Sequence, residues 1–140
     1  MFVILTAALT FASACGSVTL VYPDQSGVQF QTTDLTVGTG AVATSGKSAT
    51  VTYSLWLYDD AAADHKGKAV ANNQNATFTF VLGSGGVIPG FDQAVTGMAV
   101  GGSRHAVVPP SLAYGSQGNS DGSIPPNAAL VFDILLTNIQ

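Results

Sequence analysis

Only two histidines, His65 and His105, are available for acid–base or nucleophilic catalysis. A Ser-His-Asp site needs a serine and an aspartate that converge on the histidine, and the sequence has no pattern that brings such a set together. Metal sites need three or four clustered His, Cys or carboxylate ligands. Asp59, Asp60 and Asp64 lie close to His65 but match no ligand spacing. We therefore expect both histidines on a solvated surface, and no metal or other cofactor.

Charge is scarce throughout the chain. Charged residues make up 9% of its 140 residues, the net charge is −4, and every acidic residue is an aspartate. Four basic residues cannot form a stripe that follows a phosphate backbone, so nucleic acid is an unsuitable partner. The length fits one domain with a core of its own, and we expect a monomer.

The sequence opens with an apolar run that ends at the single cysteine, Cys15. The run is too short to span a bilayer, which needs about 20 residues, and it ends in small residues as an exported precursor does. Residues 1–15 therefore predict a signal peptide. Ala14-Cys15 resembles a bacterial lipobox, in which the cysteine carries a lipid. Ala12-Ser13-Ala14 also fits ordinary cleavage and secretion, and a buried N-terminal strand or helix is the third alternative.

These patterns predict export to the bacterial periplasm or a membrane-anchored lipoprotein, with membrane contact only through a lipid on Cys15. Asn75-Ala76-Thr77 is a glycosylation sequon, which would matter only in a eukaryotic secretory pathway.

Periodicity predicts an α+β domain, in which one helix covers one face of an antiparallel sheet. Residues 48–58 alternate strictly, with Trp56 on the face opposite the apolar side chains. Residues 59–75 are small and polar, which predicts a long loop. The other expected elements are an arm (16–31), strands (77–82, 103–109 and 130–138) and a helix (88–98).

Aromatic residues remain as the candidates for a site, and they fall on core-facing positions or at loop mouths. They form either plain core or the wall of a pocket. The residues are Tyr53, Phe78, Phe80, Phe91, Tyr114 and Phe132.

Residues 32–140 resemble the FKBP-type peptidyl-prolyl isomerases, whose motifs occur here in family order. The matching stretches are FTF (78–80), LGSGGVIPGF (82–91), GMAVG (97–101), PSLAYG (110–115) and IPPNAALVF (124–132). The WLYD stretch at 56–59 resembles bacterial exported members. The resemblance implies an antiparallel twisted β-sheet wrapped around one short α-helix.

By the same resemblance, an aromatic pocket binds the proline. Its implied catalytic residues are Tyr53, Phe91, Tyr114 and Phe132. Its implied substrate-binding residues are Phe78, Val87, Ile88, Ile124 and Val70. Residues 116–123 correspond to a mobile flap with Ile124 as its apolar tip, and the Ile88 N–H and Tyr114 hydroxyl hold substrate carbonyls.

The chain departs from the family after its long loop. Val70 stands where the family has an aromatic wall, and Ala71 stands where it has a pocket aspartate. The resemblance implies an isomerase that acts on X-Pro-containing polypeptides, helps exported proteins to fold, and binds macrolides of the FK506 and rapamycin type. The alternative is a binding or chaperone module of the same fold with little turnover.

Overall fold

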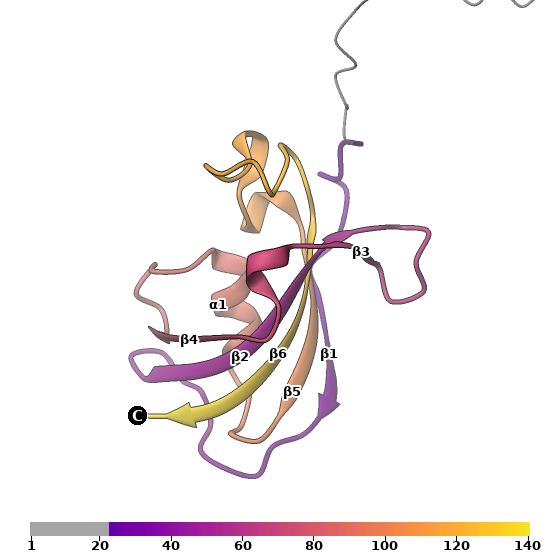
Figure 1. Ribbon diagram of the computed structural model, residues 1–140. Coiled ribbons are helices and arrows are strands. Elements are labelled where there is room, and N and C mark those ends of the chain that lie inside the picture. The colour runs from indigo at the N-terminus through magenta and orange to yellow at the C-terminus, as the bar shows by residue number, and fades with distance from the viewer. Residues whose placement is uncertain (1–22) are drawn as a thin grey trace, which may run out of the picture.

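The computed structural model describes residues 23–140, which form six strands, one α-helix and three short 3-10 helices (Figure 1). The strands are β1 (Gln31–Thr36), β2 (Ser48–Tyr58), β3 (Lys66–Ala69), β4 (Ala76–Val81), β5 (Ser103–Val108) and β6 (Leu130–Ile139). The helices are α1 (Pro89–Val95), η1 (Ala71–Asn73), η2 (Pro110–Leu112) and η3 (Gly115–Gln117).

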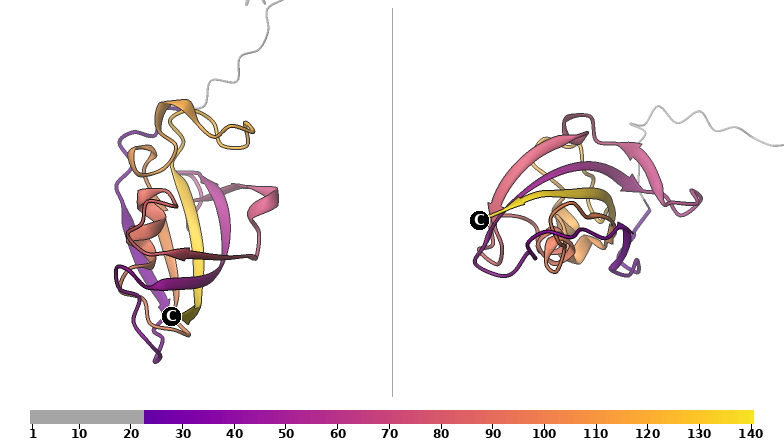
Figure 2. Two further views of the ribbon diagram at one scale, coloured as in Figure 1. Left: turned by 90° about the vertical axis from the view of Figure 1, so that its left-hand side faces the viewer. Right: turned by 90° about the horizontal axis from the view of Figure 1, so that it is seen from below.

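All strands join one antiparallel sheet in the order β1-β5-β6-β2-β3, and β4 also pairs with β2. Seen from below, the sheet forms an arc, and α1 lies inside the curve (Figure 2). The α+β architecture expected from the sequence, a twisted antiparallel sheet around one short helix, is confirmed.

The inner faces of β2 and β6 make the centre of the core. Leu55 pairs with Phe132 and Tyr53 pairs with Ile134, so the apolar positions of the two strands lie side by side. The inner-face side chains of β6, from Leu130 to Leu136, are 0–3% exposed. Burying each such side chain stabilises the fold by about 1.5–3 kcal/mol. The strict alternation of 48–58 correctly predicted β2, residue for residue.

Helix α1 is shorter than its apolar spacing predicts, since it ends at Val95 and not at Met98. Thr96 already has an extended ψ of 128°, and Gly97 has a φ of +85°, which a side chain would strain. Met98 is nevertheless 3% exposed, because the chain beyond the helix turns back against the core. At the other end, Gly90 lets the helix approach β5, and a Cβ there would lie 2.2 Å from Val108 Cγ1.

The segment 59–75, expected to be a loop, contains β3 and η1. The composition of β3, Lys-Gly-Lys-Ala, carries no alternating apolar signal. Its strand conformation comes from pairing with the end of β2, where Trp56 lies opposite Ala69. The prediction of an unstructured connection was therefore wrong for these residues, because tertiary pairing outweighs local composition.

The described part of the arm, residues 23–30, is fastened to the sheet by Gln25. Its side chain donates to the Tyr58 carbonyl (3.0 Å) and accepts from the Ala129 N–H (2.8 Å). Strand β1 begins at Gln31, the last residue assigned to the arm. The predicted signal peptide, Cys15 and residues 16–22 lie outside the described residues. None of the helices in the described part is long and apolar enough to cross a membrane.

Candidate functional site: an aromatic cavity on the inner face of the sheet

A cavity of about 200 Å³ opens between the start of α1 and the inner faces of β2 and β6. Its lining is mainly aromatic and aliphatic, with two phenol hydroxyls and one side-chain amide. The lining residues are Tyr53, Leu55, Asn73, Phe78, Gly86, Val87, Ile88, Phe91, Tyr114 and Phe132.

Phe91 forms the centre of this cavity. Its ring centroid lies 5.3 Å from that of Tyr53 and 5.2 Å from that of Phe132, both in edge-to-face geometry. Phe80 lies behind it at 5.5 Å. Edge-to-face contacts at such distances are favourable beyond simple burial. Contacts among these four rings therefore hold the shape of the cavity.

The local sequence explains how Phe91 reaches this position. Pro89 occupies the first position of α1, where a missing N–H costs nothing and the fixed φ suits a helix. The Phe91 N–H donates to the Ile88 carbonyl at 3.1 Å. Because the helix starts at this point, Val87 and Ile88 line the entrance while Phe91, 4% exposed, points inward.

Tyr114 stands at the mouth of the cavity and is 41% exposed. Partial burial raises the pKa of its hydroxyl above the ordinary value, and the nearby Tyr53 and Asp121 raise it further. The hydroxyl therefore keeps its proton at neutral pH and can donate a hydrogen bond to a carbonyl oxygen.

Three lining residues, Leu55, Gly86 and Asn73, were not predicted as site residues, and the polar one among them is Asn73. It lies at the end of η1, and its Nδ2 donates to the Tyr53 hydroxyl at 2.7 Å. It belongs to the polar run Asn72-Asn73-Gln74-Asn75, in which nothing distinguishes one amide from the next. The only available signal was that the aligned aspartate position, Ala71, had lost its polar group.

A model of the FKBP-type peptidyl-prolyl cis-trans isomerase family matches residues 40–137, which include every residue of this cavity. The chain belongs to this family. FK506-binding protein 3 of Candida albicans is 40% identical over 109 residues, which are 78% of this chain and 24% of the relative. The chloroplastic peptidyl-prolyl cis-trans isomerase FKBP19 of Arabidopsis thaliana is 40% identical, over 71% of this chain and 42% of the relative.

The chain thus spans less than half the length of these two curated relatives. Solved FKBP structures agree with the fold. The crystal structure of AtFKBP13 superimposes with a TM-score of 0.65 at 32% identity, over 79% of this chain and 93% of that one. FkpA from Escherichia coli superimposes with a TM-score of 0.63 at 29% identity, over 83% of this chain and 50% of that one.

The structure brings together seven of the nine site residues expected from the FKBP motifs. They are Tyr53, Phe78, Val87, Ile88, Phe91, Tyr114 and Phe132. Val70 and Ile124 are buried, at 5% and 3% exposure, in the hydrophobic core that also contains Phe91 and Phe132. Val70 anchors η1 beneath the cavity. Neither side chain lines the cavity.

The loop 113–129, which joins η2 to β6, is organised by its own hydrogen bonds. The Asn119 side chain accepts from the Ile124 N–H at 2.8 Å and donates to the Ser123 hydroxyl at 2.8 Å. Gly118 has a φ of +69°, and a Cβ there would lie 2.3 Å from the Ile124 carbonyl oxygen. Ile124 therefore points into the core as the root of the loop, and the exposed residues 120–123 form its outer part.

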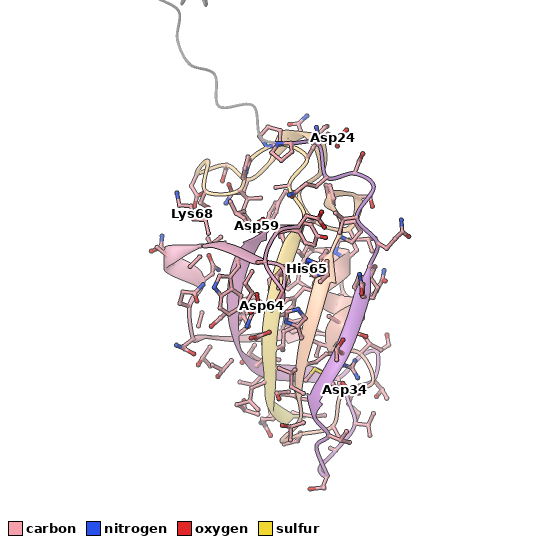
Figure 3. All side chains as sticks on the ribbon, turned by 90° about the vertical axis from the view of Figure 1, so that its right-hand side faces the viewer. Asp24, Asp34, Asp59, Asp64, His65 and Lys68 are labelled. Atoms are coloured by element: carbon pink, nitrogen blue, oxygen red, sulfur yellow. The ribbon has the colours of Figure 1, made fainter. Side chains whose placement is uncertain are left out.

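The two histidines lie away from the cavity, on the outer face of the sheet, and both are more enclosed than a solvated surface residue. Figure 3 looks onto this face, where His65 and Asp64 lie over the strands. The His65 ring stacks on Tyr58 with centroids 4.9 Å apart. His105 Nδ1 lies 2.7 Å from Asp133 Oδ1, and its side chain is 17% exposed. Among residues 23–140, no group of three or more His, Cys, Asp or Glu could hold a metal ion.

Proposed function

We propose that the protein is a peptidyl-prolyl cis-trans isomerase that acts on X-Pro-containing polypeptides. The observation that carries this proposal is the preformed cavity of Tyr53, Phe91 and Phe132, which is apolar at its centre and has hydrogen-bond donors at its mouth. A proline ring is an apolar group of suitable size for such a cavity, and its preceding carbonyl needs a donor nearby.

The chemistry requires no nucleophile and no proton transfer. Rotation about a peptide C–N bond faces a barrier of about 18–20 kcal/mol, which arises from amide resonance. Both isomers of an X-Pro bond are populated, so both can bind. The planar amide is more dipolar than the twisted transition state, in which resonance is lost. An apolar, water-poor cavity therefore disfavours the planar state more, and each 1.4 kcal/mol of this difference gives about tenfold in rate.

Each lining group has a role in this scheme. Phe91 is the floor on which the proline ring rests, with Tyr53 and Phe132 as walls. The Tyr114 hydroxyl and the Ile88 N–H are the donors for substrate carbonyls. Phe78 is 42% exposed at the rim and covers the residues that flank the proline. The same surface suits macrolide ligands of the FK506 and rapamycin type, which present carbonyls beside an apolar ring.

We also propose that this activity assists the folding of exported proteins. The support is the apolar run that ends in Ala14-Cys15, which fits a bacterial lipobox. Mass spectrometry of the native protein tests this directly. A mature chain that begins at an acylated Cys15 supports the proposal, whereas a chain that begins at Met1 contradicts it.

A second candidate function is a binding module that holds proline-containing segments with little turnover. It is favoured by the side of the cavity next to η1, where Val70 is buried and neither Val70 nor Ala71 lines the cavity, so neither position supplies an aromatic ring. A protease-coupled assay with X-Pro peptides separates the two. Turnover that is lost in Phe132→Ala supports the isomerase, whereas binding to the cavity without turnover supports the module.

A further inference from the structure

We propose that Asn73 is a positioning residue that keeps the cavity free of charge and directs the Tyr53 hydroxyl proton toward the substrate. The cavity therefore accepts an acidic residue before the proline as readily as a basic one. This inference rests on the proposed function and deepens it, since it names a substrate class for the same site.

The backbone holds Asn73 in a fixed place. The Val70 N–H donates to the Leu55 carbonyl of β2 at 3.0 Å, and the Asn73 N–H donates to the Val70 carbonyl at 2.9 Å. The Gln74 side chain donates to the same Leu55 carbonyl at 2.6 Å. The buried Val70 side chain anchors this turn from below. These hydrogen bonds attach η1 to β2, and they hold the Asn73 amide next to the Tyr53 hydroxyl.

The direction of the hydrogen bond decides what Tyr53 can do. Asn73 Nδ2 is the donor and the Tyr53 oxygen is the acceptor. The hydroxyl proton of Tyr53 is not used in this bond, so it remains available to a carbonyl oxygen inside the cavity. An ionised carboxylate can only accept hydrogen bonds, so an aspartate at this position would accept one from the Tyr53 hydroxyl, which would then not be free to donate to the substrate.

The amide of Asn73 also keeps negative charge out of the cavity, in contrast to a carboxylate at the same position. All of the described residues that line the cavity are neutral side chains or glycine, and the carboxylate that acts on the Tyr114 hydroxyl at its mouth, Asp121, lies outside the lining. A carboxylate at position 73 would repel an acidic side chain of the substrate within a partly desolvated space, where charges interact more strongly than in water. With an amide, this repulsion is absent.

Four proteins and three substrates form the main test of the inference, and Tyr53→Phe with and without Asn73→Ala completes it. Wild type, Asn73→Asp, Asn73→Ala and the control Asn72→Asp are assayed on peptides with Glu, Leu or Lys before the proline. Asn72 is exposed in the same short helix and does not line the cavity, so its substitution adds an equal charge outside the site. The assays are run at an ionic strength of about 0.15 M, where the Debye length of about 8 Å screens the negative charge of the rest of the protein.

We expect the wild type to process Glu-Pro and Lys-Pro peptides with kcat/KM values within about twofold of each other. Asn73→Asp should lower the ratio of kcat/KM for the Glu-Pro peptide to kcat/KM for the Lys-Pro peptide by about three- to tenfold. The change should come mainly from KM, because the new carboxylate repels the glutamate of the substrate. Asn72→Asp should change the ratio less than twofold. Asn73→Ala should reduce kcat/KM equally for all three peptides, and should have no further effect in a Tyr53→Phe background.

A wild-type protein that disfavours Glu-Pro more than fivefold, or equal ratios in the two aspartate variants, would overturn the inference. Failure of the proposed function gives a different result. If the wild type shows no turnover, dissociation constants for the same peptides, from amide shifts of Ile88 in NMR titrations, replace kcat/KM in the comparison. The same Glu-to-Lys shift then supports the role of Asn73 in a binding module, and its absence overturns it.

Discussion

The two faces of the central sheet hold different kinds of side chain. On the inner face, the cavity is lined by rings, aliphatic groups and neutral polar groups. On the outer face, Asp133 of β6 binds two cationic or ionisable neighbours. Lys66 Nζ lies 2.6 Å from one carboxylate oxygen of Asp133, and His105 Nδ1 lies 2.7 Å from the other. Lys66 Nζ also lies over the Trp56 ring, 4.4 Å from its centroid.

This difference separates the proposed chemistry from the titratable groups. The outer-face network joins β3, β5 and β6, so it fastens the sheet and the chain that leads to η1. The cavity needs a stable shape and a low polarity. Substitutions of residues that line the cavity should therefore change activity, whereas substitutions on the outer face should change stability alone.

The largest effect is expected for Phe91→Ala. Phe91 is 4% exposed and contacts three rings, so its removal leaves a void in the core as well as in the cavity. We expect the free energy of unfolding in urea to fall by about 3–5 kcal/mol, and isomerase activity to be lost.

Phe78→Ala is the matched control, because it removes the same side chain from the exposed rim of the same cavity. It should lower peptide affinity with much less loss of stability. Equal destabilisation by the two substitutions would contradict the central position of the Phe91 ring.

A smaller effect is expected for Arg104→Ala, which tests how the sheet holds α1. Arg104 Nη1 donates to the Ala94 carbonyl at 2.9 Å and to the Thr96 carbonyl at 3.2 Å, so it caps the end of the helix. Its Nε donates to Asp34 at 2.7 Å. Hydrogen bonds to charged groups contribute about 1.5–3 kcal/mol, and we expect a loss of stability in this range.

Arg104→Lys keeps the charge but loses the planar fork, so it should recover only part of the stability. The activity of the folded fraction should change little in either variant, because α1 remains anchored at Phe91. A complete recovery in Arg104→Lys would show that charge alone acts there.

Asp133→Asn should have a weaker effect again. The carboxylate is 29% exposed, and partly exposed ion pairs contribute about 0–1 kcal/mol. We expect the midpoint of urea unfolding to fall slightly, with kcat/KM within about twofold of the wild type. A tenfold loss of kcat/KM in a fully folded variant would break the separation between the two faces.

The elements that alternate or repeat in sequence were the predictable part of this molecule. The alternating apolar residues of 48–58 predicted strand β2, and the FKBP motifs predicted the family and most of the residues that line the cavity. The helix end was less predictable, because Met98 reaches the core after the helix has stopped. The spacing of apolar residues indicates which side chains are buried. It does not show whether a buried residue such as Met98 belongs to the helix or to the chain that follows it.

The polar wall of the cavity could not be predicted, because it depends on tertiary pairing. The strand β3 exists through its bonds to β2, and η1 follows from that pairing. Counting along the chain placed Ala71 at the aspartate position, whereas the turn brings Asn73 to Tyr53. In the same way, the resemblance gave Ile124 as a tip, but the bonds of Asn119 direct it into the core.

The smallest change is expected in the dependence on pH. The pKa of the Tyr114 hydroxyl is raised, so this donor stays protonated until the pH exceeds its ordinary value of 10.0.

Hydrogen bonds from Arg104, Lys66 and Ser123 lower the pKa values of Asp34, Asp64 and Asp121, respectively. A lowered carboxyl pKa stabilises the fold above its ordinary value of 3.8, and this contribution is lost as the pH falls through the lowered value.

Between about pH 5 and 9 the proposed chemistry needs no titrating group, and both histidines lie on the outer face, away from the cavity. We expect kcat/KM to stay level across this range when measured with the Leu-Pro peptide. The free energy of unfolding should fall below about pH 4, as Asp34, Asp64 and Asp121 lose the contribution of their lowered pKa values. A step in kcat/KM within this range that disappears in His105→Gln would show that the outer face is coupled to the cavity.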